Sequence, residues 1–470
     1  MFHGFNLVVV MRKGTYNLGK EKRELWLMVG EVFRVSIKSQ LAPGPMACAL
    51  VYFLCLYLAL APVVPKLVSY GAALVALIAI FAIPYWRFRE RRQSTATTTQ
   101  RAVFGLEVKW VLIGFCIYVL SAIISLLNNA DLDTASWRFE SYYPYLLMIA
   151  VTAMFLRLGV IQDSSVAVLL YGCATGSVVM AVASFYHVEI RGDLRAGNGT
   201  GFDENTFGYI AGLYLIILFA ASCLLKGRAL RVTLLVLSVV AYYTVYASGS
   251  RGVLVALLFA LGFLMIVTFF KVRGNHGAWF SYLVGVGLVL GLVLSIWQTA
   301  FWQRHINKVS EQVTAYYAGD ASYNSISARL SMLDGGLQIW QQHPVIGTGI
   351  GDSQNDLNAL IAQDRGLIER ASFATFHNSY VDALATTGLL GLLALVLSNF
   401  LLPLKYFFKT WRASTDASND HLVATIGVAF VLYHCVFGLF SSWVYLRNQP
   451  ITLMVLVLLL ASSSRFRGVR

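Results

Sequence analysis

The chain has 470 residues, of which 58% are hydrophobic and 13% are charged. This composition excludes an ordinary soluble domain, in which charged residues make up about a quarter of the total. The net charge of +13 would suggest a nucleic-acid partner in a soluble protein. In a membrane protein, basic residues concentrate in the loops on one side of the bilayer, so no nucleic-acid partner is expected.

Apolar segments follow one another from about residue 45 to the C-terminus. Because a helix needs about 20 mainly apolar residues to cross a bilayer, these segments predict an all-α integral membrane protein. About twelve transmembrane helices are expected, with one large polar loop that contains an amphipathic helix. The expected spans are residues 46–63, 67–85, 110–127, 142–158, 165–186, 205–225, 231–247, 252–270, 279–298, 379–402, 422–440 and 449–463.

The predicted organisation is one membrane domain with one polar insertion. Residues 1–43 form an N-terminal segment without a signal-peptide pattern, because charges interrupt every apolar stretch. Residues 44–298 hold the first nine helices, and residues 299–378 form the polar loop. Residues 379–463 hold the last three helices, and residues 464–470 form a short tail.

The distribution of Lys and Arg between alternate loops predicts the orientation of the chain. Loops rich in these residues stay in the cytoplasm, and the set of loops that includes both termini holds most of them. Both termini are therefore expected in the cytoplasm, and the loop 299–378 is expected on the outer side. The other outer loops hold only six basic residues, which are Lys66, Arg138, Arg191, Arg195, Arg251 and Arg447.

The polar loop contains a helical pattern followed by a glycine run. The expected helix should end before Pro344, and it should pack on the membrane domain or lie at the membrane interface. Gly347 to Gly351 should form a flexible turn, because a nucleotide site would need a βαβ context or a following Lys-Ser/Thr. The apolar residues of the expected helix recur at steps of three and four, and they are Ile326, Leu330, Leu333, Leu337 and Trp340.

Arginines in the outer loops are candidate ligands for a phosphate group. A guanidinium group pairs bidentately with phosphate, and a helix N-terminus adds backbone N–H donors. Arg251 follows the turn Ser248-Gly249-Ser250 and begins a helix, so its case is the strongest. Arg191, Arg195 and Arg447 are the other candidates. The alternative for each arginine is anchoring at lipid headgroups.

His377 is the candidate for proton transfer, because histidine titrates near neutral pH. It lies where the polar loop meets the tenth expected span, and the alternative is that His377-Asn378 forms an ordinary helix cap. A Ser-His-Asp hydrolase is not indicated, since the chain has no G-x-S-x-G sequence. His434, deep in a span, is expected to be a hydrogen-bonded packing residue rather than a proton relay.

Metal-binding and disulfide patterns are weak or missing in the sequence. Asp131-Leu-Asp133 is the only D-x-D sequence in the outer loops, and two carboxylates without further context are a weak signal. All six cysteines lie in expected spans, so neither a disulfide framework nor a cysteine-based zinc site is expected.

Four short motifs occur in order between Arg191 and Leu397. They are Arg195-Ala-Gly with Glu204-Asn205-Thr206-Phe207-Gly208, then Ser248-Gly-Ser-Arg251-Gly252, then His343-Pro344-Val-Ile-Gly347-Thr-Gly349, and finally His377-Asn378 with Gly388-Leu-Leu-Gly391. In these motifs and in its twelve-span layout, the chain resembles the O-antigen ligase family. These bacterial membrane glycosyltransferases share a C-terminal domain with O-antigen polymerases. Glu204 stands where the family usually has proline.

The resemblance implies transfer of a polysaccharide from undecaprenyl pyrophosphate to lipid A–core, among the membrane lipids at the periplasmic face of the bacterial inner membrane. The reaction would need no cofactor and no metal. His377 would be the catalytic base, and Arg251 with either Arg191 or Arg195 would bind the pyrophosphate. The residues expected to support the site are Asn378, Asn205 and Arg447.

Two other activities are alternatives to ligation. A polymerase of O-antigen or exopolysaccharide, from the same superfamily, would extend one undecaprenyl-linked chain with another. A transporter of lipid-linked glycans is the less favoured alternative. Transporters usually carry ionisable residues or broken helices near the middle of the bilayer, and the expected spans contain few ionisable residues.

Overall fold

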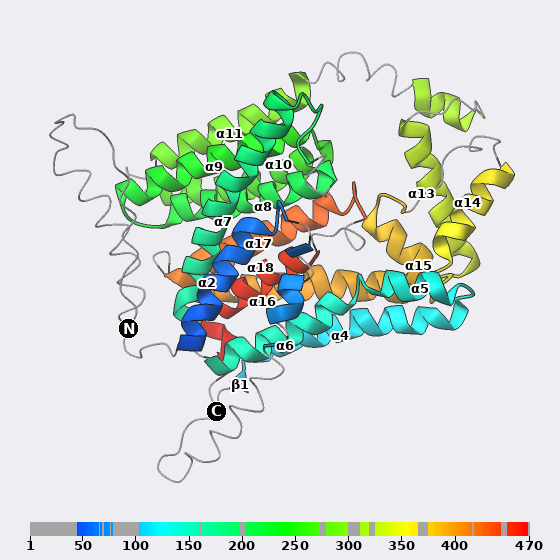
Figure 1. The fold of residues 1–470 in the computed structure, drawn as a ribbon, viewed down its shortest axis with the longest axis horizontal. Helices are drawn as coiled ribbons and strands as arrows, with labels where there is room; N and C mark the ends of the chain where they lie inside the picture. Colours follow the sequence, from blue (N-terminus) through cyan, green and yellow to red (C-terminus); the bar gives the residue numbers. More distant parts are fainter. Residues whose placement is uncertain are drawn as a thin grey trace, which may run out of the picture. The chain divides into compact units, whose positions relative to one another are not determined.

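The computed structural model describes residues 45–64, 66–67, 70–75, 77–78, 103–158, 161–197, 203–272, 279–298, 311–318, 325–364, 375–415, 418–442 and 449–468. The chain forms two units, Met1–Gly44 and Pro45–Arg470, and every described residue belongs to the second. This part is almost wholly helical (Figure 1). Its only described strands are the antiparallel two-residue pair β1 (Val103–Phe104) and β2 (Arg467–Gly468). The predicted all-helical class is confirmed.

The helices follow one another in three groups along the chain. Before the polar loop lie α2 (Pro45–Leu60), α4 (Leu106–Ser125), α5 (Leu132–Phe139), α6 (Tyr143–Leu158), α7 (Ile161–Phe185), α8 (Glu204–Leu224), α9 (Arg228–Ser248), α10 (Arg251–Val272) and α11 (Trp279–Gln298). The polar loop contains α13 (Ser325–Gln342) and α14 (Ser353–Asp364). The last group is α15 (Ser379–Val396), α16 (Leu402–Ala413), α17 (Asn419–Phe437) and α18 (Gln449–Ala461). Short 3₁₀ or π turns are η1 (Leu126–Asn128), η2 (Tyr186–Ile190), η4 (Leu397–Leu401) and η6 (Ser464–Phe466).

The helices have the lengths and composition of membrane spans. Within the described ranges, eight helical segments are long and apolar enough to cross a membrane, and three further apolar helices are shorter. Together these eleven correspond to all of the expected spans except 67–85, most of which lies outside the described residues. The chain is therefore a multi-pass membrane protein. The total of twelve spans stays a prediction.

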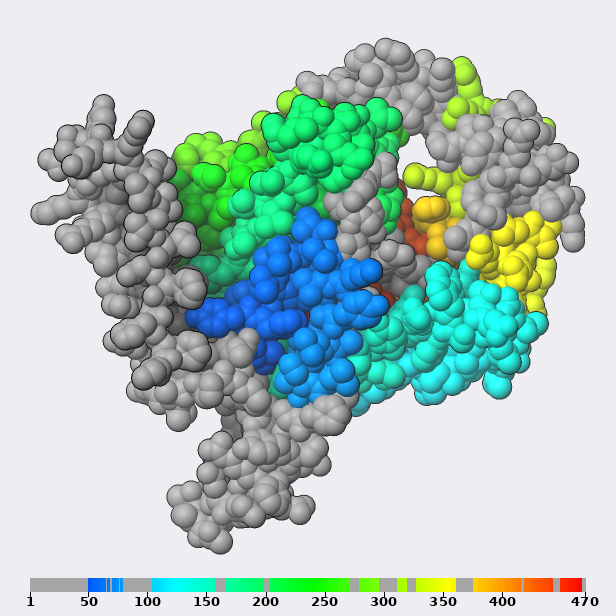
Figure 2. Space-filling model, viewed as in Figure 1, coloured from blue at the N-terminus to red at the C-terminus, as the bar shows by residue number. Residues whose placement is uncertain are grey.

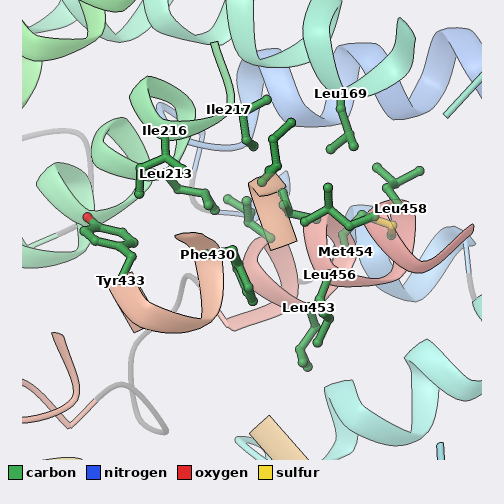
Figure 3. Close-up of a cluster of buried hydrophobic side chains, with 14 of the residues drawn as sticks. Leu169, Leu213, Ile216, Ile217, Phe430, Tyr433, Leu453, Met454, Leu456 and Leu458 are labelled. Carbon is green, nitrogen blue, oxygen red and sulfur yellow. The ribbon is translucent and has the colours of Figure 1, made fainter. Parts of the chain in front are cut away.

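Helix α8 is the central helix of the described part. All of its residues from Thr206 to Leu224 are buried, and it packs against α7, α9, α10 and α17. A helix that is apolar on every face needs neighbours on every face. Figure 3 shows part of this core, in which Leu213, Ile216 and Ile217 of α8 lie with Phe430 of α17 and several residues of α18. The packing holds the N-terminus of α8 firmly in place.

The span expected at 379–402 is longer than the sequence pattern indicated. Helix α15 continues through the π-helix η4 into α16, so the helical segment runs to Ala413. Pro403 does not stop it, because it lies just after the π-helix η4, where the regular i→i−4 hydrogen-bond pattern is already interrupted. Phe407 is buried against Gly427 of α17, and the buried Tyr406 donates its hydroxyl to the carbonyl of Leu460 in α18 (2.9 Å). Lys405 and Lys409, expected in a loop, therefore lie on a helix.

Segments that the distribution of Lys and Arg predicted on the same side of the membrane contact one another. The Gly105 N–H donates to the carbonyl of Phe466 (3.0 Å), and Lys409 forms an ion pair with Glu107 (2.8 Å). These contacts join the start of α4 to α16 and to the end of the chain. The orientation of this side relative to the cytoplasm stays a prediction.

Candidate active site

The N-terminus of α8 is tied to the turn that precedes α10. Asp203 caps α8, and its Oδ1 accepts hydrogen bonds from the N–H groups of Asn205 and Thr206 (both 3.0 Å). Asn205 accepts a hydrogen bond from the Ser250 hydroxyl through its Oδ1 (2.7 Å). Ser250 immediately precedes α10, so Asn205 fixes the starts of the two helices relative to each other.

Arg195 lies along the same turn. The N–H of Ala196 donates to the carbonyl of Ala247 (2.9 Å), which holds this loop against the end of α9. Gly249 ends α9 in the left-handed conformation (φ 62°), and its bare Cα leaves room for Arg195. A Cβ atom at Gly249 would lie only 3.2 Å from Nε of Arg195. Arg195 also interacts electrostatically with Arg251, the first residue of α10.

Arg191 has a different environment. It follows the π-helix η2, its backbone N–H donates to the carbonyl of Tyr186 (3.0 Å), and its side chain is exposed. The contact at Gly249 and the charge interaction place Arg195 beside Arg251. Arg191 stays a candidate.

His377 and Asn378 form the turn that begins α15. The Asn378 side chain accepts hydrogen bonds from the N–H groups of Tyr380 (2.9 Å) and Val381 (3.1 Å), so it caps the helix, as the sequence suggested. Its amide nitrogen donates to the carbonyl of Leu439 (3.3 Å), beyond the end of α17. This cap leaves the preceding His377 outside the helix.

The backbone of His377 is strained. Its φ of 51° is the only positive value among the described residues other than glycine. A left-handed residue with a side chain costs on the order of 1–3 kcal/mol and persists only where its surroundings impose it. Such strain often accompanies a functional role, and the exposed side chain of His377 is free to meet a ligand.

The protonation of His377 is set by its neighbours. The ring keeps an exposed surface, but nearby protein atoms partly desolvate it, and this desolvation lowers the pKa of His377 below its ordinary value. The positive charge of Arg329 lowers this pKa further, whereas the carboxylate of Asp203 acts in the opposite direction. A lowered pKa keeps the imidazole neutral near pH 7, which is the form that can accept a proton.

Arg329 is a site residue that the sequence reasoning missed. It lies on α13 with its side chain exposed, and it interacts electrostatically with both Arg251 and His377. The count of outer arginines left out the polar loop, because basic residues in a long loop carry little information on topology. The available signal was that Arg329 falls between apolar positions of the expected amphipathic helix.

Helix α13 has the bounds that the periodicity predicted, but it packs through another face. Its buried side chains include Ala328, Met332 and Ile339, whereas Leu337 of the expected apolar face is 38% exposed. A Cβ atom at Gly336 would lie 2.4 Å from the Val381 side chain, so α13 approaches α15 closely at this glycine. Close approach favours the face with small residues over the face with leucines. The leucine face is therefore not the one that packs on α15, and its placement at the membrane interface stays a prediction.

The glycine run after α13 is fixed against α15, not a flexible turn as expected. The N–H of Thr348 donates to the carbonyl of Ala385 (2.9 Å), and the N–H of Gly349 donates to that of Thr386 (3.0 Å). Gly347 has a positive φ of 73°, and a Cβ atom there would lie 2.4 Å from the carbonyl carbon of Thr386. These glycines allow backbone to pack on backbone.

The partner of the glycine run is a break in α15. Gly388 has φ 67° and ψ −163°, which interrupts the helix. Beyond the break, the N–H of Leu389 donates to the carbonyl of Pro344 (2.9 Å). The loop thus satisfies backbone groups that the interrupted helix leaves open.

The far side of the glycine run is held by the segment before α5. Asp352 accepts hydrogen bonds from the N–H groups of Ala130 (2.5 Å) and Asp131 (2.7 Å), and Arg138 donates to the Ser353 hydroxyl (2.7 Å). Figure 2 shows the yellow surface of α14 directly beside the cyan surface of α5. Asp131 itself caps α5. Within the described ranges, no group of three or more His, Cys, Asp or Glu residues could hold a metal ion.

His434 is a packing residue, as expected. Its Nδ1 lies 2.7 Å from the hydroxyl of Tyr209, and its ring stacks on Phe430. The contact joins α17 to the central helix α8 below the site. Arg447, expected to support the site, lies outside the described residues.

The N-termini of α8, α10 and α15 converge on one region. The N–H of Ser379, the first residue of α15, donates to the carbonyl of Gly438 (2.8 Å). A Cβ atom at Gly252, in the first turn of α10, would lie 2.6 Å from Cβ of Phe440. Both helices therefore begin at the turn that follows α17, and Asn205 ties in the start of α8.

This region has the electrostatics of an anion site. Helix N-termini carry partial positive charge, and here they lie with the exposed side chains of Arg195, Arg251 and Arg329. Figure 2 shows an opening between the green helices and the yellow helices, with orange and red residues at its base. A ligand with several negative charges fits this chemistry.

Comparison with known proteins agrees with the resemblance noted in the sequence. The chain is similar to an uncharacterized protein of Haemophilus influenzae, with 21% identity over 352 residues that cover 74% of this chain and 83% of that protein. Residues 233–396 match the family model described as O-antigen ligase. The matched segment contains Arg251, Arg329 and His377, and the match is consistent with a protein like those of the O-antigen ligase family.

Proposed function

We propose that this protein is an O-antigen ligase. It transfers a polysaccharide from undecaprenyl pyrophosphate to lipid A–core at the periplasmic face of the bacterial inner membrane. The observation that carries the proposal is the group of Arg195, Arg251 and Arg329 beside His377, where three helices begin. The family match over residues 233–396 supports the same reaction class.

The arginines bind the pyrophosphate of the donor. Guanidinium forks pair with phosphate oxygens in a fixed geometry, and a pyrophosphate offers more oxygens than one arginine can pair. Negative charge grows on the pyrophosphate as its bond to the sugar breaks. Donors placed in advance at that position stabilise the transition state more than the ground state. Of the two loop arginines, we assign this role to Arg195, because it lies along the turn at Gly249 and its charge acts on Arg251.

His377 accepts the proton of the acceptor hydroxyl. As the hydroxyl oxygen of the lipid A–core sugar attacks the anomeric carbon, its proton passes to the neutral imidazole. The bond from the anomeric carbon to the pyrophosphate oxygen breaks with its electron pair, and undecaprenyl pyrophosphate leaves. A single displacement inverts the anomeric configuration. The lowered pKa of His377 keeps the base available near neutral pH.

The test is deletion of the gene, with gel analysis of lipopolysaccharide and of undecaprenyl-linked glycan. A ligase predicts long polysaccharide chains that accumulate on undecaprenyl and lipid A–core that carries none. Lipid A–core capped with a single repeat unit would instead identify the polymerase. Lipopolysaccharide of normal pattern would contradict both assignments and direct the search to another acceptor.

A further inference from the structure

Asp382 is a buried carboxylate in the first turn of α15, close to the strained turn at His377. Its side chain is 2% exposed. Its Oδ1 accepts a hydrogen bond from the backbone N–H of Phe376 (3.1 Å). A helix needs its own first N–H groups capped, but here the carboxylate reaches back past the cap to a residue outside the helix.

This hydrogen bond holds one side of His377, and the helix start holds the other. Before His377, the Phe376 N–H is fixed by Asp382, and its ring is buried against α13, where a Cβ at Gly336 would lie 2.8 Å from it. After His377, Asn378 caps α15 and the Ser379 N–H donates to the carbonyl of Gly438. With both neighbours held, the backbone between them keeps its φ of 51°.

We propose that Asp382 is a positioning residue that imposes this conformation and so directs the His377 side chain towards the anion site. The proposal rests on the proposed role of His377 as the base. Without the carboxylate, the Phe376 N–H is buried without its acceptor, and only the packing of the Phe376 ring then opposes relaxation of the left-handed residue. The imidazole then leaves its place, and a displacement of about 1 Å at a reacting group can cost roughly 100-fold in rate.

A plainer role for Asp382 makes different predictions. A carboxylate in the first turn of a helix is stabilising simply through the helix dipole. In that case Asp382→Asn and Asp382→Ala would both lose the charge and would behave alike. Positioning needs only an acceptor atom, so the asparagine variant, whose side-chain oxygen can still accept from Phe376, should behave like the parent.

The kinetic experiment uses the full-length protein in detergent or nanodiscs, with lipid-linked donor and lipid A–core. We expect Asp382→Ala to lower kcat by roughly 100-fold with little change in KM, and Asp382→Asn to keep kcat within a few-fold. Asp420→Ala is the matched control, because Asp420 also lies in the first turn of a helix and accepts a backbone N–H, from Ser464 (2.7 Å). Its activity should be unchanged. Equal losses in Asp382→Ala and Asp382→Asn would overturn the proposal.

A second measurement observes His377 without reference to activity. Protein labelled with ¹⁵N-histidine is compared by NMR, and the His377 imidazole signal is assigned by its absence in His377→Gln. Asp382→Ala should move this signal, whereas Asp382→Asn should leave it in place. If Asp382→Ala does not yield folded protein, Asp382→Ser, whose shorter side chain cannot reach Phe376, replaces it. An unmoved His377 signal in the folded variant would overturn the proposal.

The two measurements separate this proposal from the proposed function. If His377→Gln retains transfer, the role of His377 as the base fails, but the NMR comparison still decides whether Asp382 holds the turn. If His377→Gln is inactive and Asp382→Ala keeps both its signal and its rate, only the positioning role fails.

Discussion

The backbone of Val345 occupies the space that a side chain at Gly388 would need. A Cβ atom at Gly388 would lie 2.4 Å from the carbonyl carbon of Val345, and the N–H of Leu390 donates to the same carbonyl (3.1 Å). This contact joins the segment after α13, the helix of Arg329, to α15, which begins beside His377. The geometry of the candidate site therefore depends on a glycine eleven positions beyond the histidine.

Gly388→Ala should destabilise the protein by more than about 2 kcal/mol, because it combines backbone strain with overlap against Val345. Thermal unfolding of the purified variants measures this. Gly192→Ala has the strain alone, since φ is 74° and no atom lies within 4 Å. Gly262→Ala in α10 has neither problem and should be neutral or slightly stabilising. A Gly388→Ala variant no less stable than Gly192→Ala would contradict the overlap with Val345.

His377→Ala should abolish glycosyl transfer while the protein still inserts and remains folded. The reason is that the acceptor hydroxyl loses its base, and general base catalysis contributes about 100- to 10,000-fold. Transfer is measured with purified protein and quantified lipid-linked donor. His343→Ala is the control, because His343 directly follows α13 and has no proposed role in the reaction. Normal transfer by His377→Ala would remove the histidine from the mechanism.

His377→Gly should be more stable than His377→Ala by about 1 kcal/mol, because glycine adopts φ of 51° without strain. At Ser414, where φ is −92°, the order should reverse. Ser414→Ala should be more stable than Ser414→Gly, because glycine there only adds conformational freedom to the unfolded chain. Thermal unfolding of the four variants decides this. If alanine is the more stable residue at both positions, the turn is not strained.

Arg329→Gln should move the acid limb of the kcat/KM pH profile to higher pH. His377 reacts as the neutral base, so the rate falls as pH drops through its pKa. Desolvation and the charge of Arg329 lower that pKa, and removal of the charge therefore raises it. Arg329→Lys keeps the charge and should keep the midpoint, whatever its effect on the rate. An unchanged midpoint in Arg329→Gln would separate Arg329 from His377.

Arg195→Lys should impair transfer strongly, and Arg191→Lys should impair it little. A lysine offers a point charge in place of the guanidinium fork, which matters only where the fork binds the pyrophosphate. Donor KM and kcat of both variants are compared under the same conditions. The reverse order would assign the pyrophosphate to Arg191 and contradict the placement of Arg195 along the turn at Gly249.

Features that depend on neighbouring residues in the chain were predictable from the sequence. Apolar segment length indicated a helical multi-pass membrane protein, since backbone groups in a bilayer must pair within the segment. The apolar periodicity and Pro344 indicated where α13 lies in the chain. Asn378 caps α15, and this contact involves only residues next to it in the sequence. The candidate residues Arg251 and His377 were found in the same way, because each lies where a helix begins.

Features that depend on contacts between distant segments were decided only by the tertiary structure. The face of α13 that packs was set by the fit of Gly336 against Val381, not by where its leucines lie. The local pattern places Arg329 among the apolar positions of α13 but does not reveal its partner, because only the folding of α13 onto α15 brings its charge to His377. Sequence periodicity records which side chains avoid water. It does not record which two surfaces fit closely enough to pack, and that fit assembled the site.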